Sequence, residues 1–330
     1  MVRFVSVLIA AAVAAPAVAL VPAPAGEIVG VGNLAHIVQD LDKSLALYRD
    51  AFGLEVVMQQ PFGPNLAIEK LGNTLGGQSR FVALKVPSSA VGVELIEYRN
   101  IDRQVQHPRF FDPGAVSMAF RVRDVETLFE RAIKVPGVKV ITAAGKPVTI
   151  DTPRGVLHVV FLQDPDGFVI ELAADSNPVP ADAPTGNIFG AGLEPTVKSS
   201  EQTVTFYNEL LGFSAKLGSF NPSKQMAETA GAPGASFKQS STRIPGSTAG
   251  MTFIEFKDIE RMPLEGRVQD PGTAILQLRV RDVVALTSKL KAAGVPVVTT
   301  GGEPVEVLNG IKIAIVRDPN NLMLELIQSK

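Results

Sequence analysis

Residues 32–53 read GNLAHIVQDLDKSLALYRDAFG, and they indicate a strand, a tight turn and a helix in that order. The run from 34 to 38 is apolar except for His36, which is typical of a buried strand. Asp40 stands where a helix N-cap is expected, and Gly53 stands where a helix ends. One apolar stripe at helical spacing lies between them, formed by Leu41, Leu45, Tyr48 and Phe52. We therefore predict a strand followed by an amphipathic helix of about three turns.

The same pattern returns later in the chain, because the sequence contains an internal repeat. Three stretches of the first part align with three of the second: 44–56 with 203–215, 97–125 with 255–283, and 164–172 with 318–326. Self-similarity on this scale indicates two homologous domains. We place them at 27–175 and 187–329, joined by the Pro-rich linker 176–186.

Each domain divides again into two modules. An apolar strand, an acidic or serine turn and an amphipathic helix open every module, and three strand-like runs follow. The pattern is therefore βαβββ, and it occurs at 27–100, 112–175, 187–258 and 270–329. This mixture of elements predicts an α+β fold.

The arrangement resembles the vicinal oxygen chelate superfamily of glyoxalase I, bleomycin-resistance proteins and extradiol dioxygenases. The helix DLDKSLALYRDAFGL (40–54) and the hairpin DPDGFVIEL (164–172) carry the resemblance, which covers nearly all of the chain after the first 26 residues. It implies two tandem domains whose modules pair edge to edge into two curved mixed-sheet cups, with helices on the convex faces. The concave side would hold a small ligand. Modules could pair in sequence order or across the two domains.

The first residues have the anatomy of a secretory signal peptide. A basic start, MVR, precedes the apolar run FVSVLIAAAVAA, and Ala17-Val18-Ala19 forms a small-x-small cleavage pattern. We predict that residues 1–19 are removed and that the mature protein is periplasmic or secreted. The chain has no cysteine, so disulfides cannot stabilise it.

Charge and composition limit the partners. The 31 Lys and Arg are balanced by 33 Asp and Glu, and no basic block occurs, which argues against nucleic-acid binding. No later segment is long and apolar enough to span a membrane, so we expect no membrane association after signal cleavage. A small molecule is the expected partner. We expect a monomer, because four modules in one chain can pair internally.

Metal-dependent relatives place a His or Gln on the first strand of a module, seven residues before the turn residue, and a Glu on the last strand. Here the four first-strand positions hold no histidine: they are Asn33, Ser117, Gly192 and Ile275. His36 lies three residues from Asn33 and therefore on the opposite face, because side chains alternate along a strand. We expect His36 on the helix-packed side, beside Leu34 and Val38.

Four glutamates are predicted to occupy equivalent positions in the four last strands and to face the cups: Glu97, Glu171, Glu255 and Glu325. Glutamate is disfavoured inside strands, so its recurrence needs a reason. One interpretation is a ligand or general base at the floor of each cup, with Glu97 and Glu171 as the catalytic candidates. The other is a buried charge paired with Arg121 or Arg279.

Two functions follow, and the sequence leaves open whether the protein is an enzyme. The first is a binding protein for a small organic molecule, without a cofactor or the standard metal site. Its expected cup residues are Asn33, Ser117, Arg121, Glu255, Arg279 and Glu325. The alternative is a glyoxalase-like lyase or isomerase that uses a hard divalent cation held by Asn33, Glu97 and Glu171. Dioxygenase chemistry is less favoured, since no site with two histidines and one carboxylate can be assembled at these positions.

Overall fold

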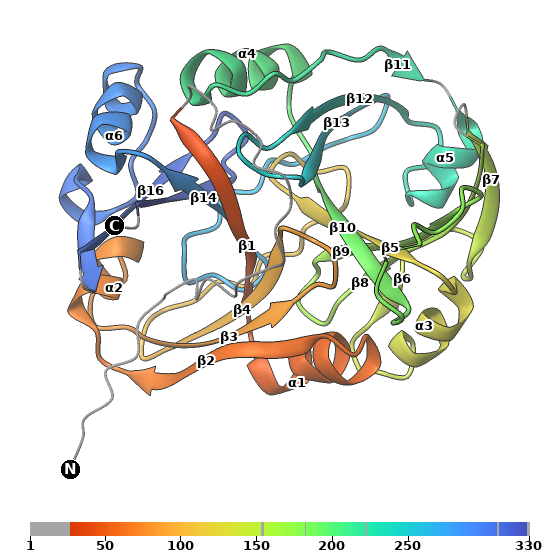
Figure 1. Ribbon diagram of the computed structural model, residues 1–330, viewed down its shortest axis with the longest axis horizontal. Helices are drawn as coiled ribbons and strands as arrows, with labels where there is room; N and C mark the ends of the chain where they lie inside the picture. The colour runs from red at the N-terminus through yellow and green to blue at the C-terminus, as the bar shows by residue number, and fades with distance from the viewer. Residues whose placement is uncertain (1–26, 153–154, 182, 222, 309, 329–330) are drawn as a thin grey trace.

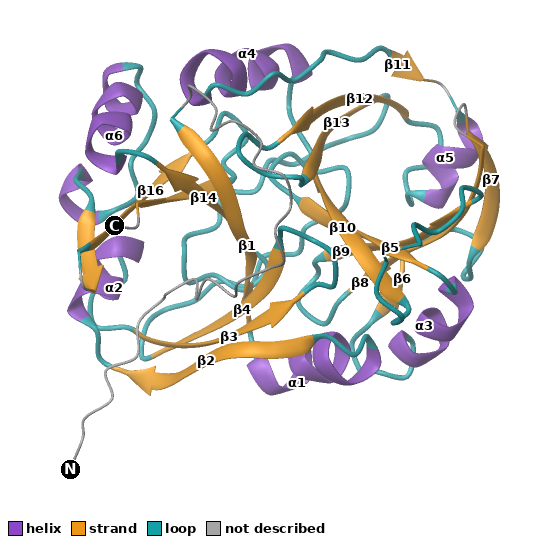
Figure 2. Cartoon of the chain, in the orientation of Figure 1, coloured by secondary structure: helices purple, strands orange, loops and turns teal. Residues whose placement is uncertain are grey.

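The computed structural model describes residues 27–152, 155–181, 183–221, 223–308 and 310–328. Two curved sheets, each with a helix-covered face, make up this part of the chain (Figures 1 and 2). Both sheets contain parallel and antiparallel neighbours, as the predicted α+β fold with mixed sheets requires. The predicted signal peptide lies outside the described residues.

Sheet A joins the first module to the last. Its strands are, in spatial order, β15 (Val305–Leu308), β16 (Ile311–Arg317), β17 (Met323–Gln328), β14 (Ala274–Val280), β1 (Ile28–Val38), β4 (Gly92–Arg99), β3 (Gln78–Lys85) and β2 (Glu55–Gly63). The antiparallel pair β1–β14 is the seam between the two modules. Because β1 and β14 belong to opposite ends of the chain, sheet A forms only when both ends meet.

Sheet B joins the second module to the third. Its strands are, in spatial order, β11 (Phe220–Asn221), β12 (Ser236–Arg243), β13 (Gly250–Lys257), β10 (Ile188–Pro195), β5 (Val116–Val122), β9 (Val169–Asp175), β8 (Gly155–Gln163) and β6 (Lys139–Val140), and β7 (Val148–Thr152) pairs with β8. The seam is the antiparallel pair β5–β10. Modules therefore pair across the two halves of the sequence and not in sequence order.

Four helical segments cover the convex faces and share one apolar core with both sheets. They are α1 (Leu41–Leu45) with its π-helical continuation η1 (Ala46–Ala51), α3 (Val125–Ala132), α4 (Ser200–Leu211) and α6 (Val283–Ala292). The turn residues Asp40, Asp124, Ser199 and Asp282 accept backbone N–H groups as N-caps, as predicted. Gly53 and Gly212 have φ angles of 73° and 72°, so their lack of a side chain allows the helices to end there.

The other two α-helices lie on the concave faces. Leu71 of α2 (Leu66–Gly72) joins the apolar cluster of sheet A, and Met226 of α5 (Lys224–Thr229) packs against that of sheet B. The single turn η2 (Thr300–Gly302) lies next to α2. In Figure 1, α2 lies at the left of the molecule and α5 at the right, so the concave faces point to opposite ends. We call the concave face of sheet A cup A and that of sheet B cup B.

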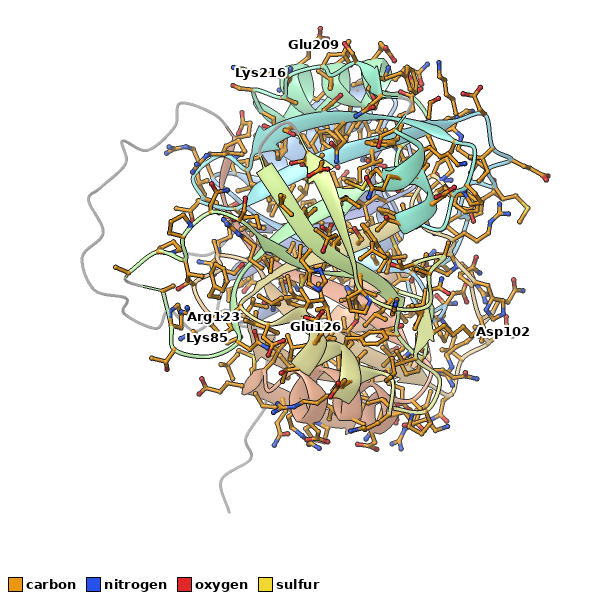
Figure 3. All side chains as sticks on the ribbon, turned by 90° about the vertical axis from the view of Figure 1, so that its right-hand side faces the viewer. Lys85, Asp102, Arg123, Glu126, Glu209 and Lys216 are labelled. Carbon is orange, nitrogen blue, oxygen red and sulfur yellow. The ribbon has the colours of Figure 1, made fainter. Side chains whose placement is uncertain are left out.

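Figure 3 shows the end of the molecule that carries sheet B. Glu209 of α4 lies at the top, Glu126 of α3 lies lower, and strands of sheet B lie between them. No helix among the described residues is long and apolar enough to cross a membrane.

Candidate functional site: carboxyl groups in the two cups

The strand register decides which acidic side chains enter cup A. On β4, Ile96 and Tyr98 belong to the apolar cluster of cup A, whereas Val93 and Leu95 belong to the helix-side core. Glu94 shares the face of Ile96, so it points into the cup. On β17, Met323 and Ile327 flank Glu325 and place it in the same cup. Cup A therefore contains two glutamates, one from the first module and one from the last.

Two amide side chains bind Glu94. Asn33 Nδ2 donates to Glu94 Oε2 at 3.2 Å, and Gln277 Nε2 donates to the same oxygen at 2.8 Å. Gln277 Oε1 accepts the backbone N–H of Asn33 at 2.9 Å. Gln277 also lies opposite Glu325 across the β14–β17 pair, and its side chain partly opposes the rise that burial causes in the pKa of that acid. One glutamine therefore links both acids and the seam between the modules.

Cup A is sealed from water. Glu94 and Glu325 are only 1% and 5% exposed, and Tyr98 is buried beside them. Burial raises the pKa of Glu94 to about 7. Burial and the neighbouring charge of Glu94 raise the pKa of Glu325 to about 8. Glu94 Oε1 is buried and has no hydrogen-bond partner. Burial therefore shifts both acids toward their neutral forms, and the hydrogen bonds that Glu94 accepts from Asn33 and Gln277 partly oppose this shift.

Cup B has a different polar cluster at the equivalent place. Ser117 of β5 lies opposite Glu194 of β10, and its hydroxyl donates to Glu194 Oε2 at 2.8 Å. The carboxyl groups of Glu171 and Glu194 share a hydrogen bond, and burial together with that contact raises the pKa of Glu171. Burial also raises the pKa of Glu194. Ionising both of two carboxyl groups in such contact is unfavourable, so the pair favours retaining a proton.

The surroundings of this cluster are partly apolar and partly open. Val169 and Ala173 flank Glu171 on β9, and Phe161 lies opposite it on β8. On the far side of the cup, Gln239 and Ser241 of β12 are exposed. Glu194 itself is partly exposed, unlike either glutamate of cup A. Cup B thus combines a polar floor, an apolar wall and an accessible rim.

Two of the predicted cup residues lie on the opposite side of the sheets. Glu97 Oε2 accepts the N–H of Leu41 at 2.9 Å and pairs with Arg80 at 2.7 Å. Glu255 Oε2 likewise accepts the N–H of Ser200 at 2.7 Å and pairs with Lys238 at 3.2 Å. The prediction that Glu97 and Glu255 face the cups is wrong. Both anchor helix N-termini, where a negative charge is favourable.

Neither predicted arginine partner, Arg121 or Arg279, pairs with a glutamate of the cups. Arg121 pairs with Asp175 at 2.6 Å, and Arg279 is exposed and lies against Gly30. The contacts of the described residues give Glu171 and Glu325 carboxyl and amide partners instead. A buried Glu–Arg pair therefore does not explain the glutamates of either cup.

The predicted residues are divided between the cups. Asn33 and Glu325 lie in cup A, whereas Ser117 and Glu171 lie in cup B. The set Asn33, Glu97 and Glu171 never meets, because the modules pair across the halves. Pairing of the modules in sequence order would have brought these three residues into one cup.

Sequence reasoning missed three functional candidates: Glu94, Glu194 and Gln277. Glu94 had a usable signal, because Glu94-Leu95, Glu171-Leu172 and Glu325-Leu326 are the same dipeptide in three last strands. A shift of three residues reverses the face of a strand, which is why Glu97 was matched in error. Glu194 and Gln277 lie five residues before their turn residues. They are two residues from the position seven before the turn and therefore on the same face of the strand.

His36 lies where the sequence predicted, on the helix-packed side. It is 1% exposed and stacks on Phe168, with ring centroids 3.7 Å apart. Its Nδ1 lies 3.2 Å from the hydroxyl of Tyr48, which donates to Asp164 at 3.0 Å. Burial lowers the pKa of His36 to about 3. This network connects the first two modules and lies outside both cups.

The side chains of cup A do not fit the metal site that the family resemblance implies. The Gln277 oxygen accepts the Asn33 N–H, so the NH₂ group of Gln277, which cannot coordinate a cation, faces Glu94. Ile275, which cannot coordinate, stands at a first-strand ligand position. Among the described residues, no group of three or more His, Cys, Asp or Glu side chains is arranged to hold a metal ion.

Comparisons with known proteins agree with this fold. Glyoxalase I from Zea mays superposes with a TM-score of 0.56 at 18% identity, covering 91% of this chain and 92% of its own. A provisionally assigned dioxygenase from Bacillus subtilis superposes with a TM-score of 0.56 at 14% identity, covering 92% of this chain and 86% of its own. No curated protein matches the sequence significantly. A family model matches residues 30–172 and 194–326, and the chain belongs to the glyoxalase/bleomycin resistance protein/dioxygenase superfamily.

Proposed function

We propose that this protein binds a small organic molecule in cup B and that it does so without a metal ion. The observation that carries the proposal is the cluster of Ser117, Glu171 and Glu194, which lies among apolar side chains beneath an exposed polar rim. A few converging polar groups on an otherwise apolar concave wall are the usual form of a small-molecule site.

The cluster favours a ligand that donates hydrogen bonds. A carboxylate only accepts, and Ser117 already donates its hydroxyl hydrogen to Glu194. A hydroxyl or ammonium group on the ligand would supply the missing hydrogens. Phe161 and Ile254 of the apolar cluster suit a compact ring or short alkyl body.

Cup A is a poorer candidate for the same role. Its acids are sealed, and the amides of Asn33 and Gln277 already donate to Glu94. A ligand would have to break these hydrogen bonds and displace buried side chains, which costs free energy. The two cups are therefore predicted to differ in binding.

Three probes test the proposal by protein-observed NMR and thermal shift. Benzylamine and catechol present hydrogen-bond donors on an aromatic body, and benzoate presents only acceptors. We expect saturable binding of a donor probe and none of benzoate. Glu194→Gln should weaken the donor probe about tenfold, the effect of roughly 1.4 kcal/mol.

The matched control is Glu325→Gln, the same substitution in the sealed cup. It should leave the affinity of the donor probe unchanged. If both variants lose affinity for the donor probe equally, or if Glu194→Gln leaves that affinity unchanged, the probe binds outside cup B.

A metal-free isomerase in the same cup is the second candidate, and the contact between Glu171 and Glu194 favours it. In a hydroxyketone, a carboxylate there could take a proton from the hydroxyl-bearing carbon while the carboxyl group protonates the carbonyl oxygen, which gives an enediol. Return of a proton to the former carbonyl carbon, with loss of the other hydroxyl's proton, would give the isomeric hydroxyaldehyde. Incubation of hydroxyacetone in D₂O tests this. Deuterium incorporation that Glu171→Gln abolishes would support an enzyme. Incorporation no faster than in buffer without protein would support a binding protein that does not catalyse this reaction.

We also propose export, supported by the sequence of residues 1–19. Mass spectrometry of the protein from an expressing cell should show a chain that begins after Ala19. We further propose a monomer, and light scattering of the mature chain tests it.

A further inference from the structure

We infer that cup A takes no metal ion and that its two carboxyl groups are held by hydrogen bonds as a neutral pair that closes the core of sheet A. The inference concerns cup A alone and does not depend on what cup B binds. The side chains of cup A differ from the metal site that the family resemblance implies.

The NH₂ groups of Asn33 and Gln277, which cannot coordinate a cation, face Glu94. A backbone N–H can only donate, so the Gln277 atom that faces the Asn33 N–H at 2.9 Å is the oxygen. The NH₂ group of Gln277 must then face Glu94 Oε2, at 2.8 Å. If the amide turned so that its oxygen faced Glu94, the Asn33 N–H would lose its acceptor and Glu94 would lose a donor.

Asn33 completes this arrangement. Its Nδ2 donates to the same Glu94 oxygen, and its Oδ1 lies against Gly92, where a side chain would clash with it. Glu94 Oε2 thus accepts two N–H groups. Neither amide is free to turn without losing a contact.

Among the residues that the structure describes, no basic side chain compensates the acids. Tyr98, Glu94 and Glu325 are the titratable groups that act on one another in this cup. Arg279 shares this face of β14, two residues beyond Gln277, but it is exposed and lies against Gly30. Two buried carboxylates without a cation would repel each other in a medium of low dielectric constant. Protonation removes that cost, and the shifts of both pKa values upward agree with it.

Glu94 Oε1 is buried and has no hydrogen-bond partner, unlike the oxygens of an ordinary structural carboxylate. Burying an ionised carboxyl oxygen without a partner costs far more free energy than burying the neutral acid. The neutral form is therefore the one that the apolar surroundings of Ile96 and Ile275 tolerate.

Two measurements on the mature full-length protein test the inference. The first is a titration with Mn²⁺, followed by its electron paramagnetic resonance signal, on the wild type and on Glu94→Gln. We expect no stoichiometric binding, or weak binding that is the same in both. Stoichiometric binding that Glu94→Gln abolishes would overturn the inference.

The second measurement is the infrared carbonyl band of protonated carboxylic acids at pH 6. We expect Glu325→Gln to lose part of this band, whereas Glu97→Gln, which removes a carboxylate paired with Arg80, should leave it unchanged. Glu94→Gln should also fold with at least wild-type stability, because an amide replaces a neutral acid closely. An unchanged band in Glu325→Gln would show that the acid is ionised and would sink the idea even if the Mn²⁺ titration were negative.

Discussion

Cup A and cup B are built from the same strand positions but have different chemistry. The first strands supply Asn33 and Gln277 to cup A, and Ser117 and Glu194 to cup B. Where cup A has two amides that donate to its acids, cup B has a hydroxyl and a further carboxyl group. One cup is sealed and its hydrogen bonds are almost all made, whereas the other is accessible and lacks donors.

The difference shows how a duplicated fold can separate stability from binding. An amide beside a buried carboxyl supplies two hydrogens and allows the cup to close. A second carboxyl supplies at most one, so part of the acceptor capacity stays unused. The same backbone therefore produces a structural core in sheet A and a candidate ligand site in sheet B.

The largest effect is expected from separating the halves of the chain, since each cup needs both. A protease site in the linker 176–186 should give two fragments that remain together in size-exclusion chromatography, because β1–β14 and β5–β10 pair across the halves. The fragment 27–175 expressed alone should lack both complete sheets. A monomeric fragment with native-like circular dichroism would contradict this pairing.

The next effect concerns the seal of cup A. Gln277→Leu removes a donor from Glu94 and leaves the Asn33 N–H without its acceptor. We expect a loss of about 2–4 kcal/mol in the free energy of unfolding, measured with urea. Gln239→Leu, on the exposed rim of cup B, is the control and should change stability by less than about 0.5 kcal/mol. If both substitutions lower the free energy of unfolding equally, cup A is no more closed than cup B.

The pH dependence of stability should also come partly from cup A. Because the pKa of Glu325 is raised to about 8 in the folded protein from 4.5, folding favours its protonated form. Its contribution is complete below pH 4.5 and is lost as the pH rises through about 8. Glu325→Gln should flatten the fall of stability over this window by roughly 3–5 kcal/mol, in urea titrations at several pH values. A slope identical to that of the wild type would mean that Glu325 is not protonated in the fold.

The smallest effect is expected in cup B. Ser117→Ala removes the hydroxyl that donates to Glu194 Oε2 at 2.8 Å. Since Glu194 is partly exposed and water can replace the hydroxyl, we expect a loss of about 1 kcal/mol in stability. The affinity of a donor probe should change with it, in the same NMR titration. A loss as large as that of Gln277→Leu would show that cup B is as closed as cup A.

Local patterns in the sequence were sufficient for most of the fold. The N-caps Asp40 and Asp282, the helix end at Gly53 and the position of His36 were all predicted, because each depends on neighbours within a few residues. The candidate site was predicted less well. Asn33, Ser117, Glu171 and Glu325 do face the cups, but their partners Gln277, Glu194 and Glu94 were missed.

The sequence by itself determined the repeat, the βαβββ modules and the alternation of faces along each strand, since these follow from local spacing and side-chain geometry. Only the tertiary structure decided that the first module pairs with the last, and hence that Asn33 meets Gln277 and Ser117 meets Glu194. The physical reason is that strand pairing joins residues far apart in the chain, and all four modules offer similar edges. Their choice of partner, and with it the chemistry of each cup, depends on the packing of the whole molecule.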